Sequence, residues 1–354
     1  MIPKQTIKRL VQWIILAVVA WGIWMTARKA GRDLSQQRAA MLREVAVLQS
    51  QLAEAKNVAH RQEIEQRIAR LTAAADQFWQ PRPSRLITGG LFYALGLFPV
   101  AMYWHACLHA VGQEVPRWPV WWAYVYGNLG KYFPGKAMVI VLRVAELQAY
   151  AIKRTAAAIT VFMETLTLMA VGGAVSALSL IILGIDRRWT WLSLALLVGT
   201  FAPTLPPVLR WILPRLQSGI EPAIMQQWLE RITWRLIFKG WLLAAITWLW
   251  WGLSLMFILT SLPLTEAADV STWKLWLSSQ AASALAVVLG FVSLVPGGAG
   301  VRELVLSVVL TPVVGPAAAL SSAVWARIVW LTTELLAVAL TALVGRHQRW
   351  SANR

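Results

Sequence analysis

Long apolar runs separated by short polar segments are the dominant pattern along this chain. An α-helix of about 20 apolar residues crosses the ~30 Å hydrocarbon core of a bilayer. The pattern therefore predicts an all-α polytopic membrane protein with about seven or eight membrane helices. The apolar runs cover residues 10–27, 86–111, 155–184, 189–213, 240–262, 273–295 and 317–344.

Two apolar segments are interrupted where a span would otherwise continue. Residues 291–303 read FVSLVPGGAGVRE, and residues 118–146 contain Pro134-Gly135 between two short apolar pieces. Proline breaks or kinks a helix, and irregular backbone at membrane depth survives only where protein buries it or it lines a wet cavity. The 118–146 segment predicts a re-entrant pair of half-helices, with one kinked span as the alternative. The 291–303 segment is either a second such break or a cytoplasmic loop between spans.

The two interrupted segments contain the same features in the same order. Each has an apolar approach, a Pro-Gly break, an arginine and a glutamate, and is followed by a span with an internal carboxylate. Matched, interrupted segments in two halves point to a transporter site and an inverted repeat. Chance similarity is the alternative, because the spacing from proline to arginine is nine residues in one half and six in the other.

Charged groups around the breaks predict a phosphate site. Helix N-termini and basic side chains attract phosphate, and arginine can bind it bidentately. Carboxylates nearby would hold the arginines until a headgroup arrives. The candidate lipid- or phosphate-binding residues are Asn128, Lys131, Lys136, Arg143, Arg302 and Arg327; the supporting carboxylates are Glu164, Glu303 and Glu334; the backbone breaks are Pro134, Gly135, Pro296, Gly297, Gly298 and Gly300.

Residues 32–79 differ from the rest of the chain, since they are polar, helix-favouring and free of proline and glycine. Apolar residues repeat at alternating spacings of four and three, as in coiled coils. The two stripes are out of phase, so the segment predicts either a helical hairpin turning near Asn57–Ala59 or one helix with a register break. A partner-binding or self-associating arm and a pair of helices packed on each other both fit.

The net charge of the chain limits the classes of partner that it is expected to bind. The net charge is +17. No basic soluble domain is present to carry nucleic acid, so anionic lipid headgroups are the expected partner, and the positive-inside excess accounts for part of the charge. A single cysteine excludes an intramolecular disulfide. His105 and His109 have metal-ligand spacing but no third ligand nearby, and no catalytic motif is present, so we expect no metal, no cofactor and no enzyme activity.

The domain organisation follows from these segments. We expect a membrane anchor over 1–31, the arm over 32–85, a membrane domain over 86–345 and a basic tail over 346–354. Lysine and arginine before the first span favour a cytoplasmic N-terminus, and the expected location is the inner membrane. Residues 214–236 predict an amphipathic helix lying in the interface. Residues 301–315 are expected to be too short to cross, which leaves the C-terminus outside, against the charge rule.

These residues also carry a family resemblance. The NLGKYFPGK motif, Arg143, Glu164, the PGGAGVRE motif and Arg327 together resemble the membrane domain of lysylphosphatidylglycerol synthase/flippase proteins and its stand-alone relatives. The resemblance covers residues 86–345. It departs at Lys136-Ala137-Met138, where smaller residues and an acidic one are expected, and it does not include the arm.

The resemblance implies a function. In that family the membrane domain moves a lipid between leaflets, and a separate soluble domain, for which this chain has no room, makes the aminoacyl-lipid. The chain is thus expected to be a flippase or scramblase for an anionic or phosphate-bearing lipid, such as a phospholipid or polyprenyl phosphate. The alternative is a non-transporting membrane subunit that recruits a glycosyltransferase or envelope-biogenesis enzyme through residues 32–79.

Overall fold

The computed structural model describes residues 28, 32, 35–36, 38–54, 57–77, 81–133, 137–184, 187–216, 221–262, 270–293 and 295–351. The predicted first span over 10–27, the break at Pro134, Gly135 and Lys136, and the last three residues of the basic tail lie outside these ranges. The described residues are overwhelmingly helical and contain no strand. This confirms the predicted all-α class.

Six segments of the described chain are long and apolar enough to cross a membrane. Their bounds lie close to those predicted, because a continuous apolar run determines each helix. They are α3 (Pro83–Ala110), α6 (Arg154–Leu183), α10 (Trp234–Leu259), α11 (Thr272–Val292), and the segments Pro296–Pro316 and Ala318–Val344, which belong mainly to α12 (Val301–Ser351).

Helices α3 and α10 form an antiparallel seam with extensive contacts. Arg85 Nη1 donates to the carbonyl of Thr260 at 2.7 Å, so the start of α3 lies beside the end of α10. We call this end of the bundle the arm end. The opposite end carries cations at many helix termini, and we call it the basic end. Its cations are Arg117, Lys153, Arg154, Arg210, Arg215, Arg231, Arg235 and Lys239.

The first interrupted segment is a hairpin that enters from the basic end. Helix α4 (Arg117–Asn128) continues into η1 (Leu129–Tyr132), and α5 (Ala137–Leu147) packs back on both. The two helices have 12 and 11 residues, about 16–18 Å of helix, which is too short to span a bilayer. The structure therefore has the re-entrant pair, not the single kinked span.

The second interrupted segment is a hairpin that enters from the arm end. Helix α11 leads into η4 (Pro296–Gly298), and the chain returns through the first part of α12 as far as Gly315. Gly315 has φ 79° and ψ 160°, which breaks the helix there. The helix thus passes through Pro312, and is longer than predicted.

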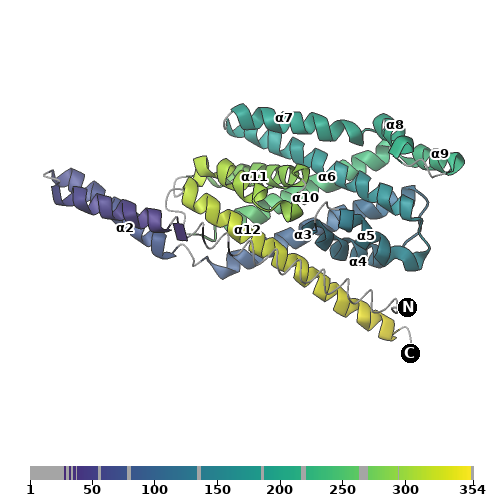
Figure 1. The fold of residues 1–354 in the computed structure, drawn as a ribbon, viewed down its shortest axis with the longest axis horizontal. Coiled ribbons are helices and arrows are strands. Elements are labelled where there is room, and N and C mark those ends of the chain that lie inside the picture. Colours follow the sequence, from purple (N-terminus) through teal and green to yellow (C-terminus); the bar gives the residue numbers. More distant parts are fainter. Residues whose placement is uncertain are drawn as a thin grey trace.

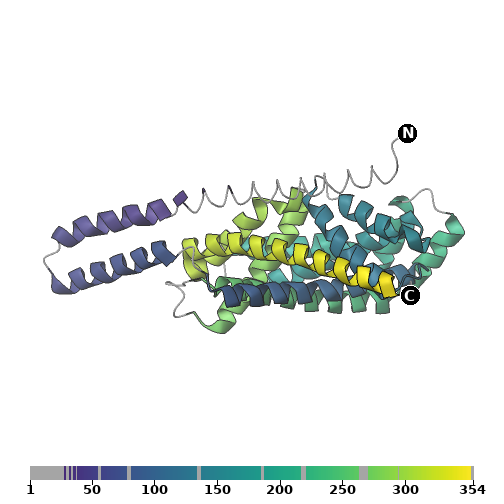
Figure 2. The ribbon, with the colours of Figure 1, turned by 90° about the horizontal axis from the view of Figure 1, so that it is seen from below.

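The second part of α12 runs from the arm end to the basic end (Figure 2). The C-terminal helix therefore ends among the other cations. The predicted conflict with the charge rule arose because residues 273–295 were expected to cross the membrane and residues 301–315 were not. In the structure both segments open to the arm end, so the last helix ends at the basic end and the conflict disappears.

The two hairpins meet inside the bundle, where η1 contacts η4. A Cβ added at Gly297 would lie 2.8 Å from the ring of Tyr132. In each half the order is span, hairpin, span: α3 and α6 flank the first hairpin, and α10 and the second part of α12 flank the second. Because the hairpins enter from opposite ends, this is the arrangement of an inverted repeat.

The predicted span over 189–213 is wrong. The chain there forms α7 (Arg187–Phe201), η3 (Ala202–Thr204) and α8 (Pro206–Leu216), with the break at the predicted prolines. Helix α7 has 15 residues, about 22 Å, and packs along α6 at the edge of the bundle (Figure 1).

Residues 214–236 also differ from the prediction of a helix lying free in the interface. Their central helix is α9 (Pro222–Arg231). Trp228 and the following Ile232 are buried in a cluster with Cys107, Met163 and Leu213. The apolar face thus packs on the protein.

Residues 38–54 and α2 (Val58–Gln77) form a helical hairpin that projects beyond the bundle (Figure 2). Asn57 Oδ1 accepts from the N–H of Ala59 at 3.0 Å, which starts α2 after the turn. Val45, Leu48 and Ile64 are buried, and Arg67 pairs with Glu44 at 3.0 Å across the hairpin. The two predicted stripes therefore pack on each other.

Candidate functional site

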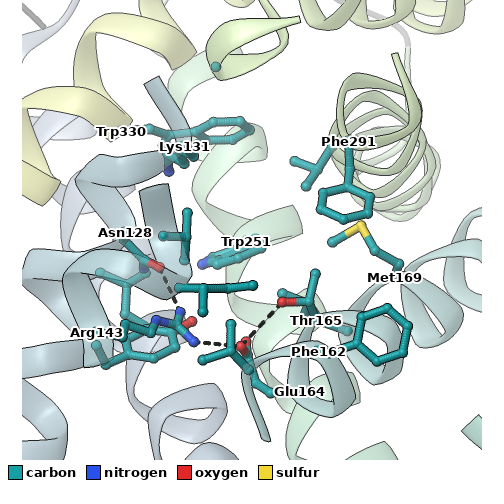
Figure 3. A pocket seen from close by; sticks show the side chains of 18 of the residues that line it. Asn128, Lys131, Arg143, Phe162, Glu164, Thr165, Met169, Trp251, Phe291 and Trp330 are labelled. Atoms are coloured by element: carbon teal, nitrogen blue, oxygen red, sulfur yellow. Dashed lines mark hydrogen bonds and ion pairs between the residues drawn. The ribbon is translucent and has the colours of Figure 1, made fainter. Parts of the chain in front are cut away.

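A cavity of about 380 Å³ lies where the two hairpins meet, against α3, α6 and α10 (Figure 3). A small space of about 20 Å³ adjoins it through shared walls at Lys131, Gly297 and Arg302. The described charged residues predicted from the sequence all surround this pair of spaces. The larger is lined by Asn128, Lys131, Arg143, Glu164, Gly297 and Arg302, and the smaller adds Glu303, Arg327 and Glu334.

Arg143 of α5 is held from several sides. Nη1 donates to Glu164 Oε2 at 2.7 Å, and Nη2 donates to Asn128 Oδ1 at 2.9 Å (Figure 3). The guanidinium carbon lies 4.3 Å from the ring centroid of Tyr124 and 4.9 Å from that of Trp104. Both charged side chains are 3% exposed, so this pair is a fixed part of the cavity wall.

Glu334 of α12 joins the two halves. Lys131 Nζ and the hydroxyl of Tyr93 both donate to Oε1, and the hydroxyl of Tyr132 donates to Oε2 at 3.1 Å. Lys131 and Tyr132 belong to the tip of the first hairpin. A carboxylate of the second half thus neutralises a cation of the first.

Glu303 begins the returning helix of the second hairpin. Its Oε2 accepts from the N–H of Gly300 at 2.6 Å, and its Oε1 accepts from Arg327 Nη1 at 2.5 Å. A glutamate in the first turn that bonds back to the helix start is a capping interaction. In this structure the chain's own carboxylate therefore bonds to this helix N-terminus.

Arg302 is the cation that lacks a carboxylate. Among the described residues it makes no ion pair, and its buried Nε has no hydrogen-bond partner. Its side chain packs on Gly290 and Gly298, where an added Cβ would come within 2.8 Å of it. The described walls carry four cations against three carboxylates, so the charge of Arg302 remains uncompensated.

The tip of the second hairpin needs its glycines. Gly297, Gly298 and Gly300 have φ of 60°, 68° and 83°. L-residues with a side chain rarely adopt this region, so the tight approach of η4 to Arg302 depends on glycine. Pro296 starts η4, as the predicted break requires.

Sequence reasoning missed the aromatic part of the site. Tyr93 stacks between Trp251 and Trp330, with ring centroids 5.4 and 5.2 Å away. The chain has 22 tryptophans, and many were expected to be anchors at the membrane interface, so nothing in the sequence marked these rings as part of a site. Tyr132 could have been found, because it follows Lys131 directly in the first motif.

The histidine pair lies away from this cavity. His105 Nε2 and His109 Nε2 are 3.1 Å apart. The described residues contain no group of three His, Cys, Asp or Glu side chains that could hold a metal ion.

An all-helical bundle in which two hairpins enter from opposite ends and meet at a charged cavity defines a polytopic, transporter-like membrane protein. Residues 71–337 match the family described as the lysylphosphatidylglycerol synthase TM region, so the chain belongs to this family. The match runs from α2 into α12 and concerns the transmembrane region, without a synthase domain. A comparison with curated proteins found no match.

Proposed function

We propose that this protein moves an anionic or phosphate-bearing lipid between the leaflets of the cytoplasmic membrane, without enzymatic chemistry. The observation that carries the proposal is Arg302, an uncompensated cation at the joint of the two cavity spaces. Arg302 is partly buried, a charge without a partner is costly in such a place, and an incoming phosphate would supply the missing negative charge. Arginine suits this task, because its planar fork can bind two phosphate oxygens.

The neighbouring cations would respond to the headgroup. Lys131 is bonded to Glu334 at the same joint, and Arg143 is bonded to Glu164 across the cavity. A phosphate at Arg302 can attract the Lys131 ammonium, which is a flexible point charge. Arg143, held by its partners and two rings, would stay in place as part of the cavity wall. Arg327 and Glu303 would hold the tip of the second hairpin.

The apolar walls fit the rest of a lipid. Phe162, Met169 and Phe291 line the side of the cavity opposite Arg143 (Figure 3). Phe162 is 37% exposed on the surface of α6, so this side of the cavity reaches the outer face of the bundle. The volume falls within the range of small-ligand sites, ~300–1,000 Å³. The headgroup would occupy the cavity while acyl chains extend past Phe162 into the bilayer.

The basic end is proposed to face the cytoplasm. Loops rich in lysine and arginine stay on that side during insertion. With this orientation the first hairpin opens to the cytoplasm, the second opens to the outside, and the arm over 38–77 lies outside. An N-terminal span over 10–27 would then start in the cytoplasm.

The test is leaflet exchange in proteoliposomes. Fluorescent phosphatidylglycerol, phosphatidylcholine and a polyprenyl phosphate are compared for wild type, Arg302→Gln and Arg235→Gln. Arg235 is an exposed cation of the basic end that lines neither space. We expect wild type and Arg235→Gln to exchange an anionic lipid, and Arg302→Gln to do so about tenfold more slowly or worse, from the loss of a charged hydrogen bond. A wild type that moves none of these lipids contradicts the proposal.

The alternative is a non-transporting subunit that recruits a glycosyltransferase or envelope enzyme through the arm. The buried seam between the two arm helices supports it less, since the predicted apolar stripes already have a partner. Deleting residues 32–79 separates the two functions. Loss of cellular function with intact lipid exchange would favour recruitment, whereas retained function would leave transport as the better explanation.

A further inference from the structure

A second cavity lies at the basic end, away from the site described above. It has a volume of about 140 Å³ and is bounded by the late part of α3, the start of α4 and the start of α10. It shares no lining residue with the central cavity. Its lining residues are Phe98, Ala101, Met102, His105, Arg117, Val120, Trp121 and Lys239.

The polar part of this cavity is positive. Arg117 is the first residue of α4, and Lys239 lies in the second turn of α10. Both side chains are exposed, and neither pairs with a carboxylate within the part of the chain that the structure describes. None of the described residues that line the cavity is acidic. The start of α4, which has no side-chain cap, adds the partial positive charge of its N–H groups.

His105 is the third polar group, and its ring is fixed. Its Nε2 lies 3.1 Å from the carbonyl oxygen of Val115. A carbonyl only accepts, so this nitrogen carries a proton, and His109 Nε2 at 3.1 Å must then act as an acceptor. The Nε2–H is therefore already engaged, and the imidazole forms a fixed polar wall of the cavity beside the two cations.

The other part of the cavity is apolar and reaches the surface of the bundle. Phe98 and Met102 are 55% and 43% exposed on α3. The rings of Phe98 and Trp121 lie 5.7 Å apart between their centroids. Phe98 precedes His105 by seven residues, about 10 Å along a helix, so the apolar wall runs from the basic end toward the middle of the bundle.

We infer that this cavity is a second lipid-binding site, for the phosphate and one acyl chain of an anionic lipid. The phosphate lies between Arg117 and Lys239, and the acyl chain follows Phe98, Met102 and Trp121. Two unpaired cations above an exposed aromatic wall fit a lipid better than a soluble anion, because a soluble anion makes no use of the wall. The site does not depend on transport through the central cavity.

The experiment uses the full chain in phosphatidylcholine vesicles that contain a small fraction of photoreactive phosphatidylglycerol or photoreactive phosphatidylcholine. The photoreactive group is on the acyl chain, and mass spectrometry maps the labelled peptides. We expect phosphatidylglycerol to label residues 98–121 several-fold more than phosphatidylcholine does. Arg117→Gln combined with Lys239→Gln should remove this preference, whereas Arg302→Gln should keep it.

A matched control carries the same loss of charge at the same end. Arg215→Gln combined with Arg235→Gln removes two exposed cations outside the cavity and should leave the labelling unchanged. Equal labelling by the two lipids, or an equal loss in the control, overturns the inference, since the attraction would then be a general surface effect. Displacement of the label by soluble glycerol phosphate would identify a free phosphate ester as the occupant instead and would equally overturn it.

Discussion

Glu303 and Arg327 form an ion pair across the break at Gly315, although 24 residues separate them. In a straight helix that separation corresponds to about 36 Å. The contact therefore requires the chain to fold back at Gly315, and it ties the second hairpin to the span that follows. The same carboxylate caps the returning helix through Gly300.

Arg327→Met should destabilise the protein, because it leaves Glu303 partly buried without its cation. The two side chains are 14% and 19% exposed, so we expect a cost of about 1–3 kcal/mol, below that of a fully buried pair. Thermal unfolding in detergent can be followed with a thiol-reactive dye, since Cys107, the sole cysteine, is buried. Combining Arg327→Met with Glu303→Gln should recover part of the loss; no recovery would argue against direct coupling.

Arg143→Met should be more damaging, because Glu164 is then left as an unpaired charge in the core of the bundle. Breaking one partner of a buried pair costs about 3–5 kcal/mol. Arg143→Lys should remain intermediate, since lysine keeps the charge but loses the planar contact with Tyr124 and the fork to Asn128. The same thiol assay gives the ranking, and lysine behaving like methionine would contradict it.

Gly130→Ala should weaken the first hairpin. An added Cβ would lie 2.5 Å from the backbone nitrogen of Val139, and backbone on both sides leaves little room to adjust. Overpacking of this kind costs about 1–3 kcal/mol. Gly199→Ala is the control, since nothing lies within 4 Å of its added Cβ and alanine favours helix. Unfolding temperatures should fall for the first variant only.

The proposed orientation can be tested by labelling intact cells. In a Cys107→Ala background, single cysteines replace Gln51 in the arm or Gln227 in α9, both of which are exposed. A membrane-impermeant maleimide should label Gln51→Cys before lysis and Gln227→Cys only afterwards. The opposite order would place the basic end outside and reverse the proposed topology.

The sequence predicted the spans and the charged members of the site, because apolar runs and buried charges leave strong signals. For residues 291–303 it left a break and a cytoplasmic loop open, and the structure has the break, with η4 at Pro296–Gly298. The sequence did not predict the partners. The carboxylates were expected to hold arginines, whereas Glu334 binds Lys131, a contact set by how the two halves pack.

The region after α6 shows a second way in which prediction from the sequence failed. Apolar content over 189–213 satisfied the criterion for a span, but proline positions decided the outcome by ending α7. The amphipathic face of α9 was recognised, yet its pattern could not distinguish lipid from protein as the surface that it covers. The periodicity of a sequence predicts that one face of a helix is apolar, but it does not predict which surface that face contacts.

The contact between Lys131 and Glu334 spans 203 residues of sequence, which has a consequence for biosynthesis. At about 5–20 residues per second, a ribosome needs roughly 10–40 s to produce the carboxylate after the lysine has emerged. During that interval the tip of the first hairpin carries a cation without its partner. The first half of the membrane domain therefore cannot complete its native packing until the last helix, which carries Glu334, has been synthesised.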